Sequence, residues 1–543
     1  MSQDQGTPEE KRGWFDVDIH PVVFFTSAAL IIGFVAGTVV FNQFVDDLFE
    51  LIQHSISLNA GWFFIWTVNI IIVVVLAILA SGFGSVRIGG PDATPEFSTL
   101  SWFAMLFSAG MGIGLLFYGV AEPVSHYSGN PFTSGDSSDV EKARMAMNLT
   151  FLHWGLHPWA IYTLVALSLA FFSFNKGLPL SIRTAFYPLF GERIYGAIGN
   201  IIDIVATVAT LFGVATSLGI GARQVNAGLS HVFPVIPETP GFQVFLIAAI
   251  TAVATWSVVR GLDKGIRFLS EVNMVIAALF ALFIFLVGPT LLILNGLLEN
   301  IGYYVQHLPQ FSTWKEAYEQ TDWQANWTIF YWSWWIAWSP FVGMFIARVS
   351  YGRTVRQFIA CVLLIPSFIT FIWMTIFGNT ALSIEMYGDG GIVDAVEENV
   401  AVSLFALFDQ FPLTSVTALL GIVVVILFFV TSSDSGSMVI DIITSGGNPN
   451  PPVLSRLFWA ILEGVVAATL LVGGGLTALQ TAAISTGLPF AIVLLGMCYT
   501  LYRGLATYVA PQEFSVETEH EVKPVRVKHV PPKGLPPGSG RLW

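Results

Sequence analysis

The feature that most constrains this chain is a series of long apolar segments, which recurs from residue 20 to residue 503. A bilayer core about 30 Å thick needs roughly 20 apolar residues for each helix that crosses it. Because backbone groups in lipid must bond within their own segment, we expect an all-α integral membrane protein with 12 transmembrane helices. The expected spans are 20–42, 59–82, 98–121, 143–174, 194–224, 241–259, 269–299, 324–347, 357–380, 413–440, 455–473 and 477–503.

The composition excludes a water-soluble domain. Of 543 residues, 54% are hydrophobic and 11% are charged, whereas soluble domains carry roughly 25% charged residues. The first apolar segment follows a polar tail and has no small-residue cleavage site, so we expect a retained span. Cys361 and Cys498 both lie in expected spans, which argues against a disulfide framework. Nothing in the chain indicates nucleic acid as a partner.

The distribution of basic residues predicts the orientation. Lys and Arg concentrate in the two tails and in every second loop between the expected spans. The loops on the opposite side hold only Lys142, Arg144, Arg223 and Lys315. The positive-inside rule then places both termini in the cytoplasm, as an even number of spans requires. We expect a cytoplasmic tail at 1–19, a twelve-span domain at 20–503 and a Pro-rich, basic cytoplasmic tail at 504–543. Residues 303–320 predict an interfacial helix.

Two clusters of aromatic residues lie inside expected spans. Residues 332–338 contain four tryptophans, and Trp154, Trp159 and Tyr162 occupy another segment. On a continuous helix the last three fall within an arc of roughly 140°, and Trp335 and Trp338 could close a cavity from the other side. Aromatic cages bind quaternary ammonium cations, at about 0.5–2 kcal/mol per contact. The alternative is an interfacial belt combined with packing.

A glycine run interrupts the third span. Gly110, Gly112 and Gly114 alternate with Met111 and Ile113, and each glycine weakens a helix by about 1 kcal/mol relative to alanine. The freed carbonyls need partners within the bilayer. The run therefore predicts either close packing of helices or a broken helix whose carbonyls coordinate a cation.

Polar residues inside spans supply further candidates. Residues 431–437 carry five hydroxyls and Asp434, which are costly in a span unless they face a cavity, a partner or an ion. They predict either a sodium site or a staple between helices. His153 and His157 are four residues apart, but a catalytic zinc site needs three protein ligands, so we expect structural, hydrogen-bonded histidines. For Glu463 we expect an interhelix hydrogen bond.

The pattern resembles the betaine/choline/carnitine transporter family across nearly all twelve spans. Residues 110–123 and 327–357 are similar to its two signature regions. The resemblance implies a LeuT-like fold of two inverted five-helix repeats, spans 3–7 and 8–12, after two N-terminal helices. It also implies a homotrimer, alternating access and a multi-pass location in a prokaryotic plasma membrane.

The resemblance also assigns roles to residues by position. The substrate box is matched by Trp154, Trp159, Tyr162 and Trp335, with Trp338 on the inward path. Aromatic gates are matched by Phe117 and Phe330. The sodium site is matched by the carbonyls of Ser108, Met111 and Phe428 and by the hydroxyls of Thr431 and Ser432. A possible second sodium site is matched by Thr210 and Phe341, although Val214 stands at its other hydroxyl position, with Thr216 and Ser217 close by.

Two details indicate the kind of substrate. Choline-type relatives carry Asp where Gly114 stands, and a glycine there suits a zwitterion that brings its own carboxylate. Sodium-independent exchangers place a base near the second ion site, whereas no Lys or Arg occurs between Arg193 and Arg223. We therefore expect sodium-coupled symport of a zwitterionic quaternary-ammonium osmolyte, above all glycine betaine, with Na⁺ as coupling ion and no covalent cofactor.

Other functions remain open at this point. The same box would suit ectoine, proline betaine or a sulfonium analogue, and an exchanger without ion coupling is a further alternative. A channel would predict flux that does not saturate. An intramembrane enzyme would have to use His153, His157, Asp434 and Glu463, which are spread over three spans and form no evident nucleophile–base pair.

Overall fold

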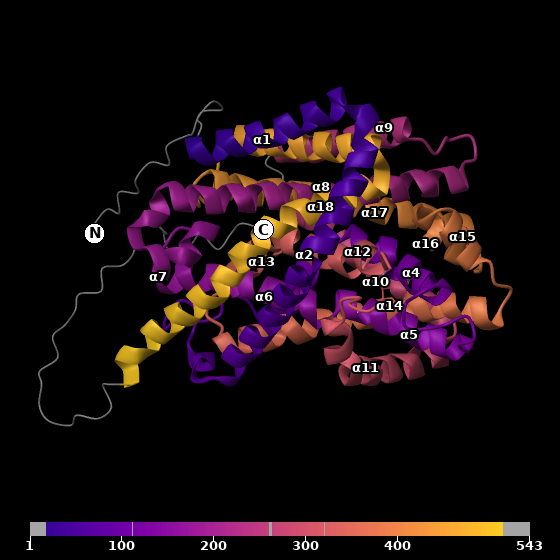
Figure 1. Ribbon diagram of the computed structural model, residues 1–543, viewed down its shortest axis with the longest axis horizontal. Coiled ribbons are helices and arrows are strands. Elements are labelled where there is room, and N and C mark those ends of the chain that lie inside the picture. The colour runs from indigo at the N-terminus through magenta and orange to yellow at the C-terminus, as the bar shows by residue number, and fades with distance from the viewer. Residues whose placement is uncertain (1–17, 111, 260–262, 320, 514–543) are drawn as a thin grey trace, which may run out of the picture.

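The computed structural model describes residues 18–110, 112–259, 263–319 and 321–513. Within these ranges the chain is helical and contains no named strand, which confirms the all-α prediction for the described residues. Figure 1 shows long helices packed side by side, with shorter helices at the ends of the bundle. The main helices are α1 (Pro21–Val40), α2 (Asn42–Ala80), α3 (Thr99–Gly110), α4 (Ile113–Ser128), α5 (Asp139–Trp154), α6 (Leu156–Ala170), α8 (Ala197–Val232), α9 (Pro240–Val259), α10 (Asp263–Val287), α11 (Thr290–Thr313), α13 (Thr328–Val349), α14 (Val355–Tyr387), α17 (Thr414–Thr444) and α18 (Val453–Glu513).

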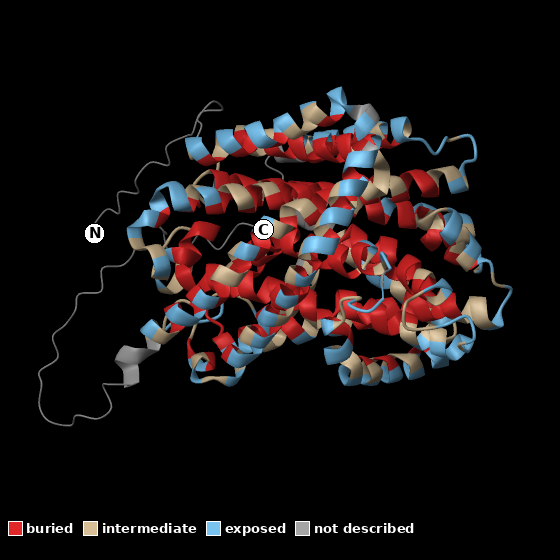
Figure 2. Cartoon of the chain, viewed as in Figure 1, coloured by how far each residue is buried: buried red, intermediate tan, exposed pale blue. Residues whose placement is uncertain are grey.

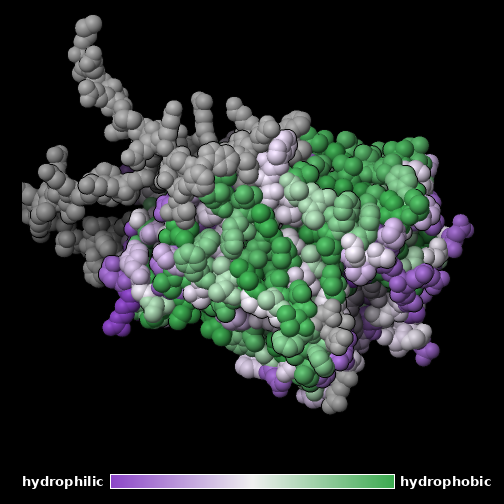
Figure 3. All heavy atoms as spheres, turned by 90° about the horizontal axis from the view of Figure 1, so that it is seen from above, coloured by the Kyte–Doolittle hydropathy of each residue, from purple (hydrophilic) through white to green (hydrophobic). Residues whose placement is uncertain are grey.

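Several of these helices are suited to cross a bilayer. Judged by length and composition, seven described segments qualify, or up to nine if each of two bent helix pairs forms one span. Large apolar side chains such as Leu100, Leu291 and Leu298 are exposed, and hydrophobic residues cover much of the face in Figure 3. This surface fits lipid, while the count of twelve spans and the inverted repeat remain predictions.

Glycine and proline interrupt the long helices at defined points. The α3 and α4 axes are bent by 67° across the glycine run, and Gly155 separates α5 from α6. In α18, Gly474 and Gly475 have φ angles of 158° and 57°, outside the helical region. Glycine allows such backbone geometry because it lacks a Cβ. The kink in α18 coincides with the predicted boundary between spans 11 and 12.

The predicted boundary near residue 300 is wrong. The expected span 269–299 ends early, because α10 stops at Val287 and α11 begins at Thr290 after a bend of 109°. The segment predicted as an interfacial helix over 303–320 is therefore the second half of a helix that begins at residue 290. Pro289 explains the break, since proline has no N–H to continue the helical hydrogen bonds.

Helix α13 lies at the centre of the bundle. It packs against α6, α18, α8 and α2, and nearly all of its residues are buried, as the red core in Figure 2 indicates. Its four tryptophans at 332, 334, 335 and 338 are at most 5% exposed. They cannot form an interfacial belt, which excludes that alternative for this cluster. Short helices α15 (Ile392–Glu398) and α16 (Ser403–Phe408) pack against α4.

Candidate functional site

The structure brings the predicted box residues together in the buried centre. The ring of Trp335, from α13, lies 4.9 Å from that of Trp154 and 6.5 Å from that of Tyr162, measured between centroids. Trp159 and Tyr162 meet edge to face at 5.4 Å. Edge-to-face contacts direct the positive edge of one ring at the negative face of another. Trp338 lies beside the group, with its ring 5.2 Å from Phe341.

The box is assembled across a helix break that the sequence analysis missed. We expected Trp154, Trp159 and Tyr162 on one continuous helix, but Trp154 is the last residue of α5 and the other two belong to α6. A Cβ at Gly155 would lie 2.6 Å from the Phe151 carbonyl oxygen. Only glycine therefore fits at the break, and the prediction of a single helical arc is wrong although the rings still converge.

The glycine run lies directly against the tryptophans. A Cβ at Gly110 would overlap the Trp159 ring, and one at Gly112 would lie 3.2 Å from Trp338. At Gly114 a Cβ would lie 2.9 Å from both Trp154 and Trp334. The absence of side chains lets the backbone of the broken span approach the rings. Close packing and a helix break, the two predicted structural features of the run, occur together, while cation coordination by its carbonyls stays a prediction. Met111 itself lies outside the described residues.

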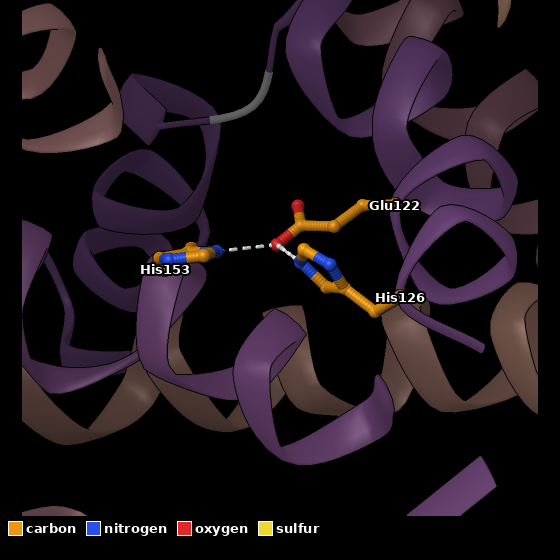
Figure 4. Close-up of side chains that lie close together, drawn as sticks. All are labelled: Glu122, His126 and His153. Carbon is orange, nitrogen blue, oxygen red and sulfur yellow. Dashed lines mark hydrogen bonds and ion pairs between the residues drawn. The ribbon is translucent and has the colours of Figure 1, made fainter. Parts of the chain in front are cut away.

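A buried carboxylate on α4 holds the box from one side. Glu122 Oε2 accepts hydrogen bonds from Trp154 Nε1 at 2.6 Å and from the Tyr331 hydroxyl at 2.5 Å. Its Oε1 lies 2.6 Å from His153 Nδ1 and 3.4 Å from His126 Nε2, as Figure 4 shows. A buried ionised group is stable only when it is paired and hydrogen-bonded. Glu122 thus links α4, α5 and α13 at the box.

The aromatic contacts continue to the two predicted gates. Phe117 and Phe330 are fully buried, and Tyr118 lies between them, with ring centroids 4.8 Å from Phe117 and 6.5 Å from Phe330. Phe330 also stacks on Trp334 at 5.4 Å. One connected group of rings therefore extends from the gates to the box.

Of the predicted sodium ligands, all but Met111 are described, and they lie on α3 and α17. Thr431 donates to the Leu427 carbonyl at 2.9 Å, and its hydroxyl lies 3.2 Å from the Phe428 carbonyl oxygen. Ser432 is buried beside it, and Ser108 is half-buried near the end of α3. The hydroxyl of Thr431 and the carbonyl of Phe428 are thus adjacent within α17.

The environment of the possible second sodium site is more apolar. Thr210 donates to the Ala206 carbonyl within α8 at 2.7 Å. Val214 faces α17, where a Cβ at Gly436 would lie 2.9 Å from its side chain. The hydroxyl of Thr216, an alternative ligand, already donates to Phe212 and Leu479 carbonyls at 2.8 and 3.0 Å.

The remaining polar candidates act between helices. Arg456 of α18 donates to Asp434 of α17 at 2.6 Å, which supports the staple interpretation for that carboxylate. Ser433 donates to Glu463 at 3.2 Å, which confirms the expected interhelix hydrogen bond. His153 is hydrogen-bonded as expected, whereas His157 stacks on Trp332 at 5.3 Å.

Sequence reasoning missed three residues that shape the site: Glu122, Tyr331 and Tyr118. Glu122 carried a usable signal, because a carboxylate inside an apolar span is costly and calls for a partner. Its partners could not be predicted from local sequence patterns, since Tyr331 lies 209 residues further along the chain. Two further side chains of ligand type, Glu122 and His126, lie beside His153, and the spacing of the paired histidines did not indicate them.

The sequence is similar to those of known transporters along most of its length. The family model described as "BCCT, betaine/carnitine/choline family transporter" matches residues 22–510. A glycine betaine/proline/choline transporter of Vibrio parahaemolyticus is 49% identical over 510 residues, covering 91% of this chain and 92% of the relative. A glycine betaine transporter of Bacillus subtilis is 44% identical, covering 89% of this chain and 93% of the relative.

We predict that Glu122→Ala strongly lowers the melting temperature of the purified protein in detergent. The change leaves the donors of Trp154, Tyr331 and His153 without their acceptor, at a cost of about 1–3 kcal/mol for each orphaned group. Glu398→Ala, at an exposed carboxylate of α15, is the control and should melt like the wild type. Equal melting temperatures for all three proteins would contradict the role of Glu122.

Proposed function

This chain belongs to the betaine/carnitine/choline transporter family, and we propose that it is a sodium-coupled symporter of glycine betaine in a prokaryotic plasma membrane. The observation that carries the proposal is the buried box of Trp154, Trp159, Tyr162 and Trp335. Such rings attract a trimethylammonium group through their negative faces. Similar relatives are named glycine betaine transporters, two of which are also named for proline and choline.

The charge balance at the box favours a zwitterion. The Oε2 atom of Glu122 already accepts hydrogen bonds from Trp154 and Tyr331, so this oxygen is not free to pair with a cation among the rings. At Gly114 there is no side chain and little room for one. A substrate with its own carboxylate enters such a site without adding net charge. Ectoine, proline betaine and sulfonium analogues share this property and are the alternatives within the same class.

Sodium coupling is supported by the oxygen atoms on α17 and by the break between α3 and α4. Thr431 and Phe428 present a hydroxyl and a carbonyl side by side, and hard cations prefer oxygen ligands of this kind. Helix breaks that expose carbonyls are a recurrent device for ion binding in secondary transporters. Each Na⁺ that enters down a potential of 100 mV supplies about 2.3 kcal/mol, enough for roughly fifty-fold accumulation.

The burial of the box supports alternating access. Its rings are at most 5% exposed, so a substrate bound among them needs a change of conformation to enter and to leave. The links from Glu122 to α5 and α13 join the first half of the bundle to the second. We infer homotrimeric assembly, two cytoplasmic termini and the twelve-span inverted repeat from the family resemblance and the charge pattern.

Uptake of labelled glycine betaine into proteoliposomes tests this function. We expect saturable accumulation with an inward sodium gradient and little with potassium in its place. Competition by unlabelled ectoine, proline and choline ranks the substrates. Equal uptake in both salts would contradict sodium coupling and favour an exchanger, and uptake that does not saturate would indicate a channel.

Replacement of Trp335 should weaken substrate binding. The loss of one cation–π contact, about 0.5–2 kcal/mol, predicts that Trp335→Ala raises the Kd for glycine betaine roughly 2- to 30-fold. Trp335→Phe keeps a ring and should have a smaller effect. Trp332→Phe, a buried tryptophan on the same helix whose ring contacts His157, is the matched control. The box is in the wrong place if Trp335→Ala binds as tightly as the wild type.

Removal of two hydroxyls should weaken sodium binding. The double change Thr431→Ala and Ser432→Ala removes two proposed ligands and preserves helix propensity. Sodium affinity should fall, and betaine affinity at fixed sodium should fall with it, because coupling between two ligands is reciprocal. Ser437→Ala on the same helix, whose hydroxyl bonds to the Asp434 carbonyl, is the control. An unchanged sodium dependence of uptake would show that sodium binds at other residues.

A further inference from the structure

We propose that Glu122, His126 and His153 form a binding site for a transition-metal ion of the Zn²⁺ class, next to the aromatic box. One ligand atom from each side chain lies within 4.8 Å of the others, and all three residues are fully buried. Figure 4 shows the two imidazole rings on opposite sides of the same carboxylate oxygen. Imidazole nitrogen and carboxylate oxygen are ligands that zinc prefers in proteins.

His126 is the observation that points to a ligand. Its Nδ1 has no hydrogen-bond partner, and its Nε2 makes only a long contact with Glu122 Oε1, although the side chain is fully buried. A buried polar group without a partner costs about 1–3 kcal/mol, and such a group calls for an ion or a water beside it. Its Nε2 lies 3.4 Å from Glu122 Oε1. In a tetrahedral site with bonds of about 2.0–2.1 Å, neighbouring ligand atoms are roughly 3.3 Å apart.

His153 can supply the second nitrogen ligand as a neutral imidazole ring. Its Nε2 lies 2.9 Å from the Thr328 hydroxyl, and its Nδ1 lies 2.6 Å from Glu122 Oε1. A hydroxyl both donates and accepts, so Thr328 can satisfy Nε2 in either tautomer of the neutral ring. Binding of a metal at Nδ1 would replace the proton that this nitrogen donates to Glu122, and Nε2 would then donate to Thr328. Metal-bound histidines commonly donate their other N–H to such a partner, which fixes the ring.

The surroundings provide charge compensation and an entry path. Glu122 would offset one of the two positive charges of the ion, and a hydroxide or chloride as fourth ligand would offset the other. The rings of Trp327 and Trp323 lie 4.4 and 5.3 Å from His126. Both indoles are half-buried, and His126 stands in the last turn of α4. Movement of these two side chains would therefore open the cluster to the adjacent surface.

Metal binding should affect the box, a consequence that rests on the proposed function. The oxygen of Glu122 that does not face the histidines accepts from Trp154 and Tyr331. A metal on the other oxygen draws the carboxylate toward the histidines and withdraws charge from these two hydrogen bonds. The metal should thus weaken substrate binding, and the substrate should weaken metal binding by the same factor.

Cobalt absorption spectroscopy on the purified full-length protein tests the site without any transport assay. We expect Co²⁺ to give visible bands of a tetrahedral N/O site, saturating at one ion per chain and disappearing on addition of Zn²⁺. His126→Phe should abolish the bands, whereas His157→Phe, at a buried histidine outside the cluster, should retain them. His126→Cys should keep binding and add a thiolate-to-cobalt charge-transfer band, which identifies residue 126 as a ligand even if the Phe variant folds poorly.

Several outcomes would overturn the site. These are the absence of tetrahedral bands in the wild type, identical bands in His126→Phe, and a Cys variant that binds cobalt without a thiolate band. For the coupling, we expect saturating Zn²⁺ to raise the Kd for glycine betaine roughly tenfold. An unchanged Kd with the cobalt bands intact would refute the coupling. The proposed transport function would not be affected by that result, because sodium-driven uptake is measured without metal.

Discussion

The hydrogen bonds of the Glu122 carboxylate are the interaction on which the rest of this site depends. A carboxylate inside a bilayer-spanning bundle is stable only with a full set of donors. Here these donors come from Trp154, Tyr331 and His153, which belong to α5 and α13. The same contacts that stabilise the charge also orient the rings of the box. The energetic requirement of one buried group therefore fixes the geometry of the surface proposed to bind substrate.

The site also requires the backbone to approach the indole rings closely, and glycine residues make this possible. Rings as large as indole can meet in one place only if the backbone around them leaves room. Gly110, Gly112 and Gly114 allow the broken span to approach Trp159, Trp338 and Trp154, and Gly155 lets the chain turn between two box residues. The helix propensity lost at these positions is offset by the burial of aromatic surface, since each large ring buries about 150–250 Å².

Much of this arrangement could be predicted from the sequence, and the part that could not has a physical explanation. Apolar run length predicted most of the long helices, although not the helix break near residue 288, and aromatic density predicted the clustered rings of the box. Local patterns carry no information on contacts between distant segments, so the link between Glu122 and Tyr331, 209 residues apart, was missed. The break at Gly155 was missed because one glycine does not by itself end a helix. Spacing likewise paired His153 with His157, whereas His126, from a different helix, is the histidine that shares its carboxylate.

The account requires that the substrate cation be bound by the rings that Glu122 and the glycines bring together. Determination of the structure with saturating glycine betaine and sodium tests this most directly. The account predicts density for the trimethylammonium group within about 6 Å of the ring centroids of Trp154, Trp159, Tyr162 and Trp335. Density at any other place in the bundle, with these four rings still in contact with one another and no ligand among them, would contradict it.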